Sequence, residues 1–163
     1  MHLEGVIRLN ISAASEYGIR ASLHLADAFL KDPRQLTTTE EIATSEKIPT
    51  KFLEALLRKL KAARLIKSQR GINGGHILQV DPSDIYLADI IRAIDGPLAA
   101  VRGERPESLK YSGSSKHLTK AWIAVRSSLR AVLEEISLTQ VLEGKFPNKI
   151  SKELSNPDAW ARR

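Results

Sequence analysis

The chain has 163 residues, 42% of them hydrophobic, which is enough for one ordinary domain with a short appended element. It contains no cysteine, which excludes disulfides, thiolate metal sites and thiol nucleophiles. Its formal net charge of +6 favours an anionic partner, either nucleic acid or a membrane surface, over an acidic small substrate.

Membrane binding is the less favoured of these two readings. No apolar run approaches the roughly 18 residues of a membrane span, and the start of the chain lacks the apolar segment of a secretion signal. A basic amphipathic helix could still lie on a membrane surface. The apolar stripes described below are aliphatic and compact, however, which favours burial in a core. We therefore expect no membrane association and a cytoplasmic location.

Two helices are predicted near the start, after residues 1–10, which show no periodicity and are interpreted as an extension. The first begins near Ser12, a residue type suited to an N-cap, and ends before Pro33. Its apolar stripe consists of Tyr17, Ala21, Leu25 and Ala28. Thr38 and Glu41 then have the spacing of a capping box, which predicts a short second helix.

A third helix is predicted to start at Pro49, because proline at the first helical position loses no needed donor. Leucines recur in it at intervals of three and four, which makes one apolar stripe: Leu53, Leu56, Leu57 and Leu60. Charged residues recur at the same intervals on the opposite face: Lys51, Glu54, Arg58 and Lys61. The third helix therefore presents a line of charge to the outside.

The excess positive charge is confined to this helix and the segment after it. Residues 51–70 carry seven basic side chains and one acid, Glu54, while the other 143 residues balance at 18 basic and 18 acidic. Most charge runs are solvated surfaces. Confinement of the whole excess to one window instead favours a polyanionic partner.

A β-hairpin and a fourth helix follow. Residues 67–80 read as two short strands around a Gly/Asn-rich turn, since glycine permits the backbone angles of such turns. The fourth helix ends at Gly96-Pro97. Its apolar residues are Tyr86, Leu87, Ile90, Ile91 and Ile94.

Residues 97–115 are rich in glycine, proline, serine and charge, and are predicted to form a loop over the body. Tyr111 of this loop and Trp122 of the next helix predict that the loop packs over that helix.

Residues 116–143 are predicted to form a long helix and a short one. The long helix has a heptad seam spaced 4, 3, 4, 3, 4, and its length would be about five turns. The seam consists of Leu118, Trp122, Val125, Leu129, Val132 and Ile136. From spacing alone, it could be buried in the monomer or in a dimer. Residues 138–143 form the short helix, and residues 144–163 are expected to be weakly ordered.

A winged helix-turn-helix has three short helices followed by a hairpin, which is the order predicted here. The positive charge lies on the third helix and the hairpin. A helix fits the major groove, and an arginine at a glycine-rich turn can reach the neighbouring minor groove. The residues expected to contact DNA are Thr38, Thr39, Thr50, Lys51, Phe52, Glu54, Arg58, Lys59, Lys61, Arg70, Gly71, Asn73, Gly74 and Gly75. In the free protein, the spacing also favours an ion pair between Glu54 and Arg58, which is compatible with a DNA contact.

Residues 48–60 (IPTKFLEALLRKL) and 70–76 (RGINGGH) together resemble the recognition helix and wing of the Rrf2 family of bacterial repressors. The resemblance covers roughly residues 9–142. It implies a homodimer in which the long heptad helix crosses its mate and two winged domains face a palindromic operator. It also implies that Glu54 reads a cytosine amino group and that Arg70, with Gly71 and Gly74, enters the minor groove. A carboxylate can accept that hydrogen bond from cytosine.

The resemblance implies that the loop of residues 97–115 is a candidate effector region, because the family places its sensor there. The side chains that could line such a site are Arg102, Glu104, Arg105, Glu107 and Tyr111. A simpler alternative, which we favour, is the packed loop described above.

The sequence departs from the best-known members of that family, which hold an iron-sulfur cluster with cysteines in the loop that corresponds to residues 98–115. Because this chain has no cysteine, it is expected to bind no thiolate-held cluster and to have no cofactor. The histidines His24, His76 and His117 are scattered, so no metal site is expected. No nucleophile motif is present, and an enzyme is not expected.

Together these patterns predict a mainly α fold with a small β-hairpin wing: a winged helix-turn-helix domain over residues 9–96, followed by a dimerisation helix. The predicted function is a sequence-specific transcriptional regulator that binds double-stranded DNA as a homodimer. We expect a repressor, because a bound dimer most simply blocks polymerase. The alternative is a winged-helix interaction module whose basic face docks an acidic protein.

Overall fold

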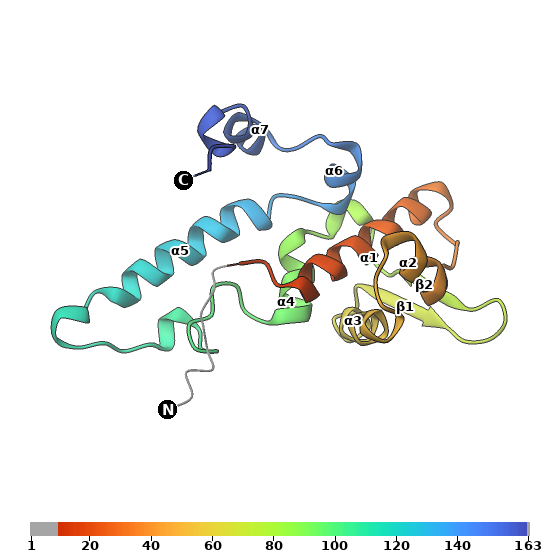
Figure 1. Cartoon of the computed structure of the whole chain (residues 1–163), viewed down its shortest axis with the longest axis horizontal. Coiled ribbons are helices and arrows are strands. Elements are labelled where there is room, and N and C mark those ends of the chain that lie inside the picture. Colours follow the sequence, from red (N-terminus) through yellow and green to blue (C-terminus); the bar gives the residue numbers. More distant parts are fainter. Residues whose placement is uncertain (1–9, 163) are drawn as a thin grey trace.

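A computed structural model describes residues 10–162 (Figure 1). The helices are α1 (Ala13–Lys31), α2 (Thr39–Glu46), α3 (Thr50–Ala62), α4 (Leu87–Asp95), α5 (Leu118–Leu133), α6 (Leu138–Glu143) and α7 (Asn148–Leu154). Between α3 and α4 lies a hairpin of β1 (Ile66–Gln69) and β2 (Gly75–Leu78). The predicted mainly α fold with one hairpin is confirmed. Apart from Asn10, the predicted extension lies outside the described residues.

Helix α1 runs through the middle of the winged domain, and it contacts α2, α3, α4, α6 and β2 (Figure 1). It begins at the predicted N-cap, where the Ser12 hydroxyl oxygen accepts a 2.9 Å hydrogen bond from the Ser15 amide. At Gly18 the neighbouring α4 comes so close that a Cβ atom would lie 2.0 Å from Ile94 Cδ1. The absence of a side chain at Gly18 therefore allows α1 and α4 to pack closely.

Helices α2 and α3 follow the local signals in the sequence. Thr38 caps α2, and Glu41 completes the predicted capping box. Helix α3 begins at Thr50, one residue later than predicted, because Pro49 has an extended ψ of 127° and acts as the N-cap residue. The four leucines of its stripe are all buried in the core, and full burial of each contributes roughly 1.5–3 kcal/mol. The stripe thus fixes which face of α3 points outward.

The hairpin is antiparallel, with Ile66 opposite Leu78 and Gln69 opposite Gly75. Its turn is closed by a 2.9 Å hydrogen bond from the Gly74 amide to the Gly71 carbonyl. Ile66 and Leu78 are buried in the same core as the α3 leucines. The hairpin is therefore anchored at its base, while its turn extends from the body (Figure 1).

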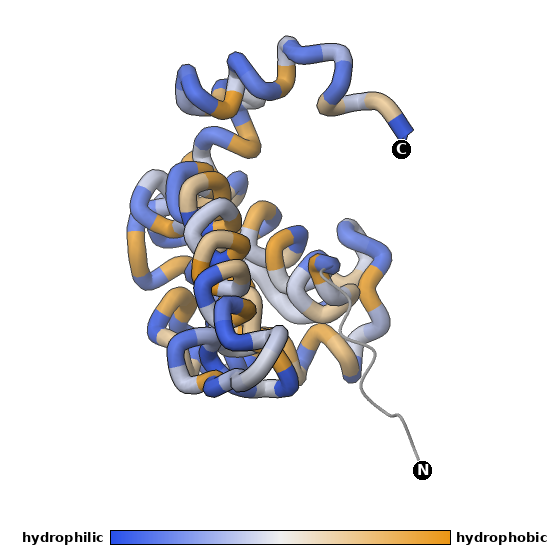
Figure 2. Tube along the Cα trace, turned by 90° about the vertical axis from the view of Figure 1, so that its left-hand side faces the viewer, coloured by the Kyte–Doolittle hydropathy of each residue, from blue (hydrophilic) through white to orange (hydrophobic). Residues whose placement is uncertain are grey.

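Helix α5 lies along one side of the molecule, and none of its residues is buried within the described part of the chain (Figure 1). Apolar and polar segments alternate along it (Figure 2). The predicted seam is wrong at Ile136, because the helix ends at Leu133. Ile136 is buried instead, and its carbonyl oxygen accepts a 3.0 Å hydrogen bond from the Leu87 amide at the start of α4. The seam on α5 therefore comprises five residues.

The C-terminal segment contains one helix that the sequence pattern did not predict. Helix α6 spans the predicted residues 138–143, and its Leu138 is fully buried. Helix α7 then occupies part of the segment expected to be weakly ordered. It has seven residues and buries one side chain, Ile150, so it is too short for a periodic stripe to reveal. Among residues 10–162, no helix has the length and apolar character needed to cross a membrane.

Candidate nucleic-acid interface

The outward face of α3 carries charges that are free of intramolecular ion pairs. Lys51, Glu54, Arg58 and Lys61 are all exposed, as the periodicity predicted. Within residues 10–162, none of the four forms a salt bridge. The expected ion pair between Glu54 and Arg58 is therefore not formed. A surface line of unpaired charge can bind an external partner without first breaking an internal contact.

One flank of α3 is fixed against α1 by an aromatic contact. The rings of Phe52 and Tyr17 meet edge to face, with centroids 5.7 Å apart and an interplanar angle of 82°. The Arg20 guanidinium lies over the Tyr17 ring, 5.5 Å from its centroid, and forms ion pairs with Glu16 and Glu46. Phe52 stays 40% exposed. Its ring therefore holds α3 in place while one part still faces solvent.

Lys59 points toward the body of the domain rather than along the outward line. Its ammonium donates a 2.8 Å hydrogen bond to the Ile94 carbonyl, near the C-terminal end of α4. A cation at that position also interacts favourably with the helix dipole. The structure therefore does not bring Lys59 together with Lys51, Arg58 and Lys61, and it gives Lys59 a structural role that spacing alone did not reveal.

The hairpin turn presents Arg70, Gly71, Ile72 and Asn73 to solvent. Ile72 is fully exposed at the turn, and it was not among the residues expected to contact DNA. The sequence could nevertheless have predicted its exposure, because a large apolar residue in a turn between Gly71 and Asn73 lies too far from the core to be buried. Together with the α3 face, the turn forms the candidate DNA interface, defined as Lys51, Glu54, Arg58, Lys61 and Arg70 to Asn73.

Gly74 and Gly75 have a structural role in the hairpin, because each lies against a neighbouring backbone segment. A Cβ atom at Gly74 would lie 2.3 Å from the Gln69 carbonyl oxygen. One at Gly75 would lie 2.7 Å from the carbonyl oxygen of Thr37, and Gly75 has a φ of +154°. Both positions therefore require glycine because the backbone passes too close for a side chain. At Gly71, with a φ of +109°, the space around a Cβ atom is open.

The hairpin is fastened to the start of α2 through His76. Backbone hydrogen bonds of 2.9 and 2.8 Å join Thr37 to His76. The His76 ring lies 3.0 Å from the Thr39 hydroxyl at Nε2 and 2.9 Å from the Ser68 hydroxyl at Nδ1. Burial, and then the positive charge of Lys61, lower the pKa of His76. Thr39 thus contacts His76 of the hairpin, and Thr38 caps α2, so both hydroxyls have partners within the domain.

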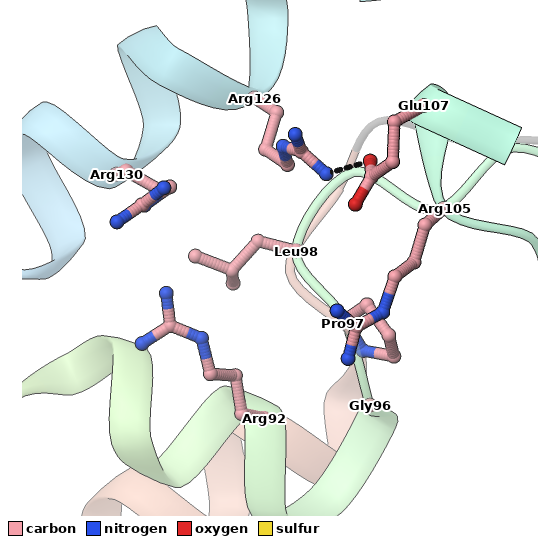
Figure 3. A pocket seen from close by; sticks show the side chains of 8 residues that line it. All are labelled: Arg92, Gly96, Pro97, Leu98, Arg105, Glu107, Arg126 and Arg130. Carbon is pink, nitrogen blue, oxygen red and sulfur yellow. Dashed lines mark hydrogen bonds and ion pairs between the residues drawn. The ribbon is translucent and has the colours of Figure 1, made fainter. Parts of the chain in front are cut away.

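The predicted effector residues separate in the structure. Arg105 lines a cavity of about 380 Å³ between α4, α5 and the loop (Figure 3). Arg102 and Glu104 do not line it; the Glu104 backbone pairs with that of Val101. The Tyr111 hydroxyl accepts a 3.3 Å hydrogen bond from Trp122 Nε1, as expected for a loop packed over the long helix. Glu107, also predicted, lines the same cavity, but sequence reasoning missed its other charged residues because they lie on α4 and α5.

Comparisons with known proteins show which family and which solved structures the chain is similar to. Residues 11–144 match the model of the Rrf2 family, described as an iron-dependent transcriptional regulator. A Mycobacterium tuberculosis (strain H37Rv) protein, named as an HTH-type transcriptional regulator, is 39% identical over 144 residues, covering 88% of this chain and 88% of that protein. The HTH-type transcriptional regulator CymR of Bacillus subtilis is 32% identical over 130 residues, covering 80% of this chain and 87% of CymR.

Two solved structures are similar over most of the chain. The structure of B. subtilis CymR, described as the global cysteine regulator, superposes with a TM-score of 0.66 and 31% identity, covering 82% of this chain and 96% of that one. The structure of T. potens IscR superposes with a TM-score of 0.65 and 30% identity, covering 98% and 97%. The similarity extends well beyond the winged domain, into the helices that follow it.

Proposed function

The chain belongs to the Rrf2 family of transcriptional regulators, and from this premise we propose that it is a sequence-specific repressor that binds a palindromic operator as a homodimer. The family assignment makes it a DNA-binding regulator rather than an enzyme. The proposal adds the residues that would read the operator, the oligomeric state and the sign of regulation. Acting on chromosomal DNA, such a repressor would work in the cytoplasm.

The observation that carries the proposal is the exposed, unpaired charge on the outward face of α3. An α-helix fits the major groove, where a carboxylate can accept a hydrogen bond from the amino group of cytosine. We assign that contact to Glu54, the one acid on the face. Lys51, Arg58 and Lys61 flank it and would neutralise phosphates with release of counterions. Glu54 would thus supply discrimination between sequences, while the basic residues mainly supply affinity.

The wing would enter the adjacent minor groove. Arg70 carries the positive charge that the negative potential of a narrow minor groove attracts. The exposed Ile72 side chain, two residues further along the turn, would pack on the sugar edges of that groove. Backbone bonds between Thr37 and His76 hold the wing beside α2, and Ile66 and Leu78 of the hairpin share the core with the α3 leucines, so the wing and α3 would move as one unit.

Helix α5 supports the proposed homodimer, because its apolar residues are not fully covered by a single chain. Leu118, Trp122, Val125 and Leu129 are half-buried, and Val132 is 41% exposed. A second copy of α5 crossing the first would cover this seam. The two α3 helices of such a dimer would then meet half-sites about one or more helical turns apart.

Iron dependence, which the family description includes, does not fit the donor set of this chain. The sequence has no cysteine. Residues 10–162 hold no group of three or more His, Cys, Asp or Glu side chains arranged to bind a metal ion. The cavity next to the loop is lined by arginines, which repel cations. We therefore propose that this regulator uses no thiolate-bound cluster.

The first test measures DNA binding by fluorescence anisotropy with duplexes selected from a random pool. The protein should prefer the selected site over a scrambled duplex, and its affinity should fall steeply with salt. The selected sites should contain two inverted half-sites. Equal binding to selected and scrambled duplexes would remove the main support for a sequence-specific repressor.

The second test separates base reading from backbone binding. Glu54→Gln should lose about 1–3 kcal/mol of discrimination at one base pair of each half-site. Arg70→Ala should weaken binding by about 1–3 kcal/mol if it contacts the groove. Arg34→Ala is the matched control, because the Arg34 side chain is 93% exposed and lies outside the candidate interface. Arg70→Ala binding as tightly as this control would take Arg70 out of the interface.

A further inference from the structure

We propose that the cavity between α4, α5 and the loop is a binding site for a small dianion whose charge is carried by phosphate, sulfate or carboxylate groups. Its volume of about 380 Å³ is in the range of small-molecule sites. We further propose that its occupancy changes the affinity of the protein for operator DNA. This second part rests on the function proposed above, whereas the binding itself does not.

Four arginines from three separate parts of the chain surround the cavity (Figure 3). Arg92 comes from α4, Arg105 from the loop, and Arg126 and Arg130 from α5. Leu98, which is buried, lies between them. The Arg130 side chain lies above the end of the Leu98 side chain in this view, and the Arg92 side chain lies below it. The arrangement is an apolar centre with a ring of guanidinium groups.

The guanidinium groups outnumber the carboxylates that could neutralise them. Arg126 pairs with Glu107, while Arg92 and Arg130 share the single carboxylate of Glu134. Arg105 forms no salt bridge within the described chain. Four positive charges therefore face two negative ones, which leaves an excess of +2. A dianion would balance it.

The electrostatics of the two carboxylates agree with a positive cavity. Hydrogen bonds from Arg92 and then from Arg130 lower the pKa of Glu134. The pKa of Glu107 is lowered too, by a hydrogen bond from its own backbone and by one from Arg126. Both carboxyl groups therefore remain ionised at neutral pH. The count of four positive and two negative charges, and its excess of +2, holds at that pH.

The residue type points to an oxyanion rather than to another anion. All four cations are arginines, whose planar fork of donors matches the oxygens of carboxylate, sulfate and phosphate groups with two hydrogen bonds at once. The apolar surface of Leu98 would contact the body of the ligand. Chloride, a single atom, cannot use this geometry.

The site is connected to α3 through the end of α4. Gly96, Pro97 and Leu98 line the cavity directly after that helix. Two residues before Gly96, the Ile94 carbonyl accepts the hydrogen bond from Lys59 of α3. On the other side, Leu133 of α5 packs against the cluster that contains Leu98. A ligand held by Arg92 of α4 and Arg130 of α5 would therefore set the angle between α5 and the winged domain.

Isothermal titration calorimetry with inorganic phosphate, sulfate and malonate, at constant ionic strength made up with chloride, tests the binding. At least one of the three should bind saturably, and the order of affinities distinguishes the tetrahedral oxyanions from the dicarboxylate. Arg105→Gln is the informative variant, since it breaks no salt bridge, and it should weaken binding about tenfold. Arg102→Gln, an exposed arginine in the same loop, should bind as the wild type does.

Absence of saturable binding for all three anions overturns the proposal, as does equal binding by Arg105→Gln and the wild type. A second measurement repeats the anisotropy titration with and without the bound anion. If the anion changes DNA affinity, DNA must change anion affinity by the same factor, and Arg105→Gln should lose the effect. Unchanged DNA affinity would overturn the regulatory part alone. Failure to distinguish the selected from the scrambled duplex would instead count against the repressor function, with the anion site still supported.

Discussion

Replacing Gly75 with alanine should loosen the attachment of the wing. The backbone at Gly75 has a φ of +154°, which costs a residue with a side chain about 1–3 kcal/mol. The new Cβ atom would lie 2.7 Å from the Thr37 carbonyl oxygen, whereas ordinary contact begins at 3.4 Å, so the two segments must separate by 0.7 Å. That movement stretches the two hydrogen bonds between Thr37 and His76, from 2.8 and 2.9 Å, past the usual limit of about 3.2 Å.

Loss of those two hydrogen bonds costs about 1–3 kcal/mol more, since each contributes a net stabilisation of about 0.5–1.5 kcal/mol. The free energy of unfolding should therefore fall by roughly 2–6 kcal/mol. Urea unfolding followed by circular dichroism gives this value from the midpoint, provided that the slope of the transition is unchanged. Affinity for operator DNA should fall too, because the wing would no longer be held beside α2.

Gly71→Ala is the matched control for this experiment. Gly71 also has a positive φ, of +109°, but a Cβ atom there meets nothing within 4 Å. Its cost should be the backbone term of about 1–3 kcal/mol alone. If Gly75→Ala and Gly71→Ala destabilise the protein equally, to within about 0.5 kcal/mol, the close approach at Thr37 does not carry the energy assigned to it.

Three further predictions concern the contacts around α2 and α3. Lys59→Met keeps the side-chain stem but removes the hydrogen bond to the Ile94 carbonyl, so the free energy of unfolding should fall by about 1 kcal/mol, with little change in DNA affinity. Thr38→Ala removes the cap of α2 and should cost about 1 kcal/mol by the same measurement. The lowered pKa of His76 means that the unfolded chain binds its proton more tightly, so stability should rise with pH from the folded pKa up to about 6.5. His76→Gln should flatten that slope.

Each of these has an outcome that would contradict it. A Lys59→Met variant that binds DNA as weakly as Lys61→Met would place Lys59 in the interface after all. Thr44→Ala, at an exposed position inside α2, should leave stability unchanged or raise it slightly, so a cost equal to that of Thr38→Ala would contradict the capping role. A pH slope that persists in His76→Gln would have to arise from other groups.

The secondary structure was largely predictable because its causes are local. Ser12 and Thr38 start their helices because each hydroxyl oxygen accepts a hydrogen bond from the amide three residues ahead. The four-leucine stripe determines which face of α3 is buried, and therefore that Lys51, Glu54 and Arg58 face outward. Helix α7 was missed, since seven residues with one buried side chain show no period.

Some positions were assigned wrongly or missed because their role depends on distant segments. Lys59 has the spacing of a surface residue, yet its ammonium meets the Ile94 carbonyl, 35 residues away. Ile136 has the spacing of the heptad seam, but α5 ends at Leu133. The Ile136 carbonyl oxygen instead accepts a hydrogen bond from the Leu87 amide at the start of α4. A heptad pattern records spacing only, and it does not show where a helix stops.

Residue types and short spacings were enough to predict the order of the elements up to α6, the confinement of excess positive charge to residues 51–70 and the lack of thiolate ligands, on which the proposal of no thiolate-bound cluster rests. Each of these follows from residue type and from neighbours within a few positions. The other features depend on how distant segments pack, above all the cavity lined by Arg92, Arg105, Arg126 and Arg130. In the sequence these arginines lie in a helix, a loop and a second helix, with no shared period. Only the packing of α5 and the loop against α4 brings their charges together.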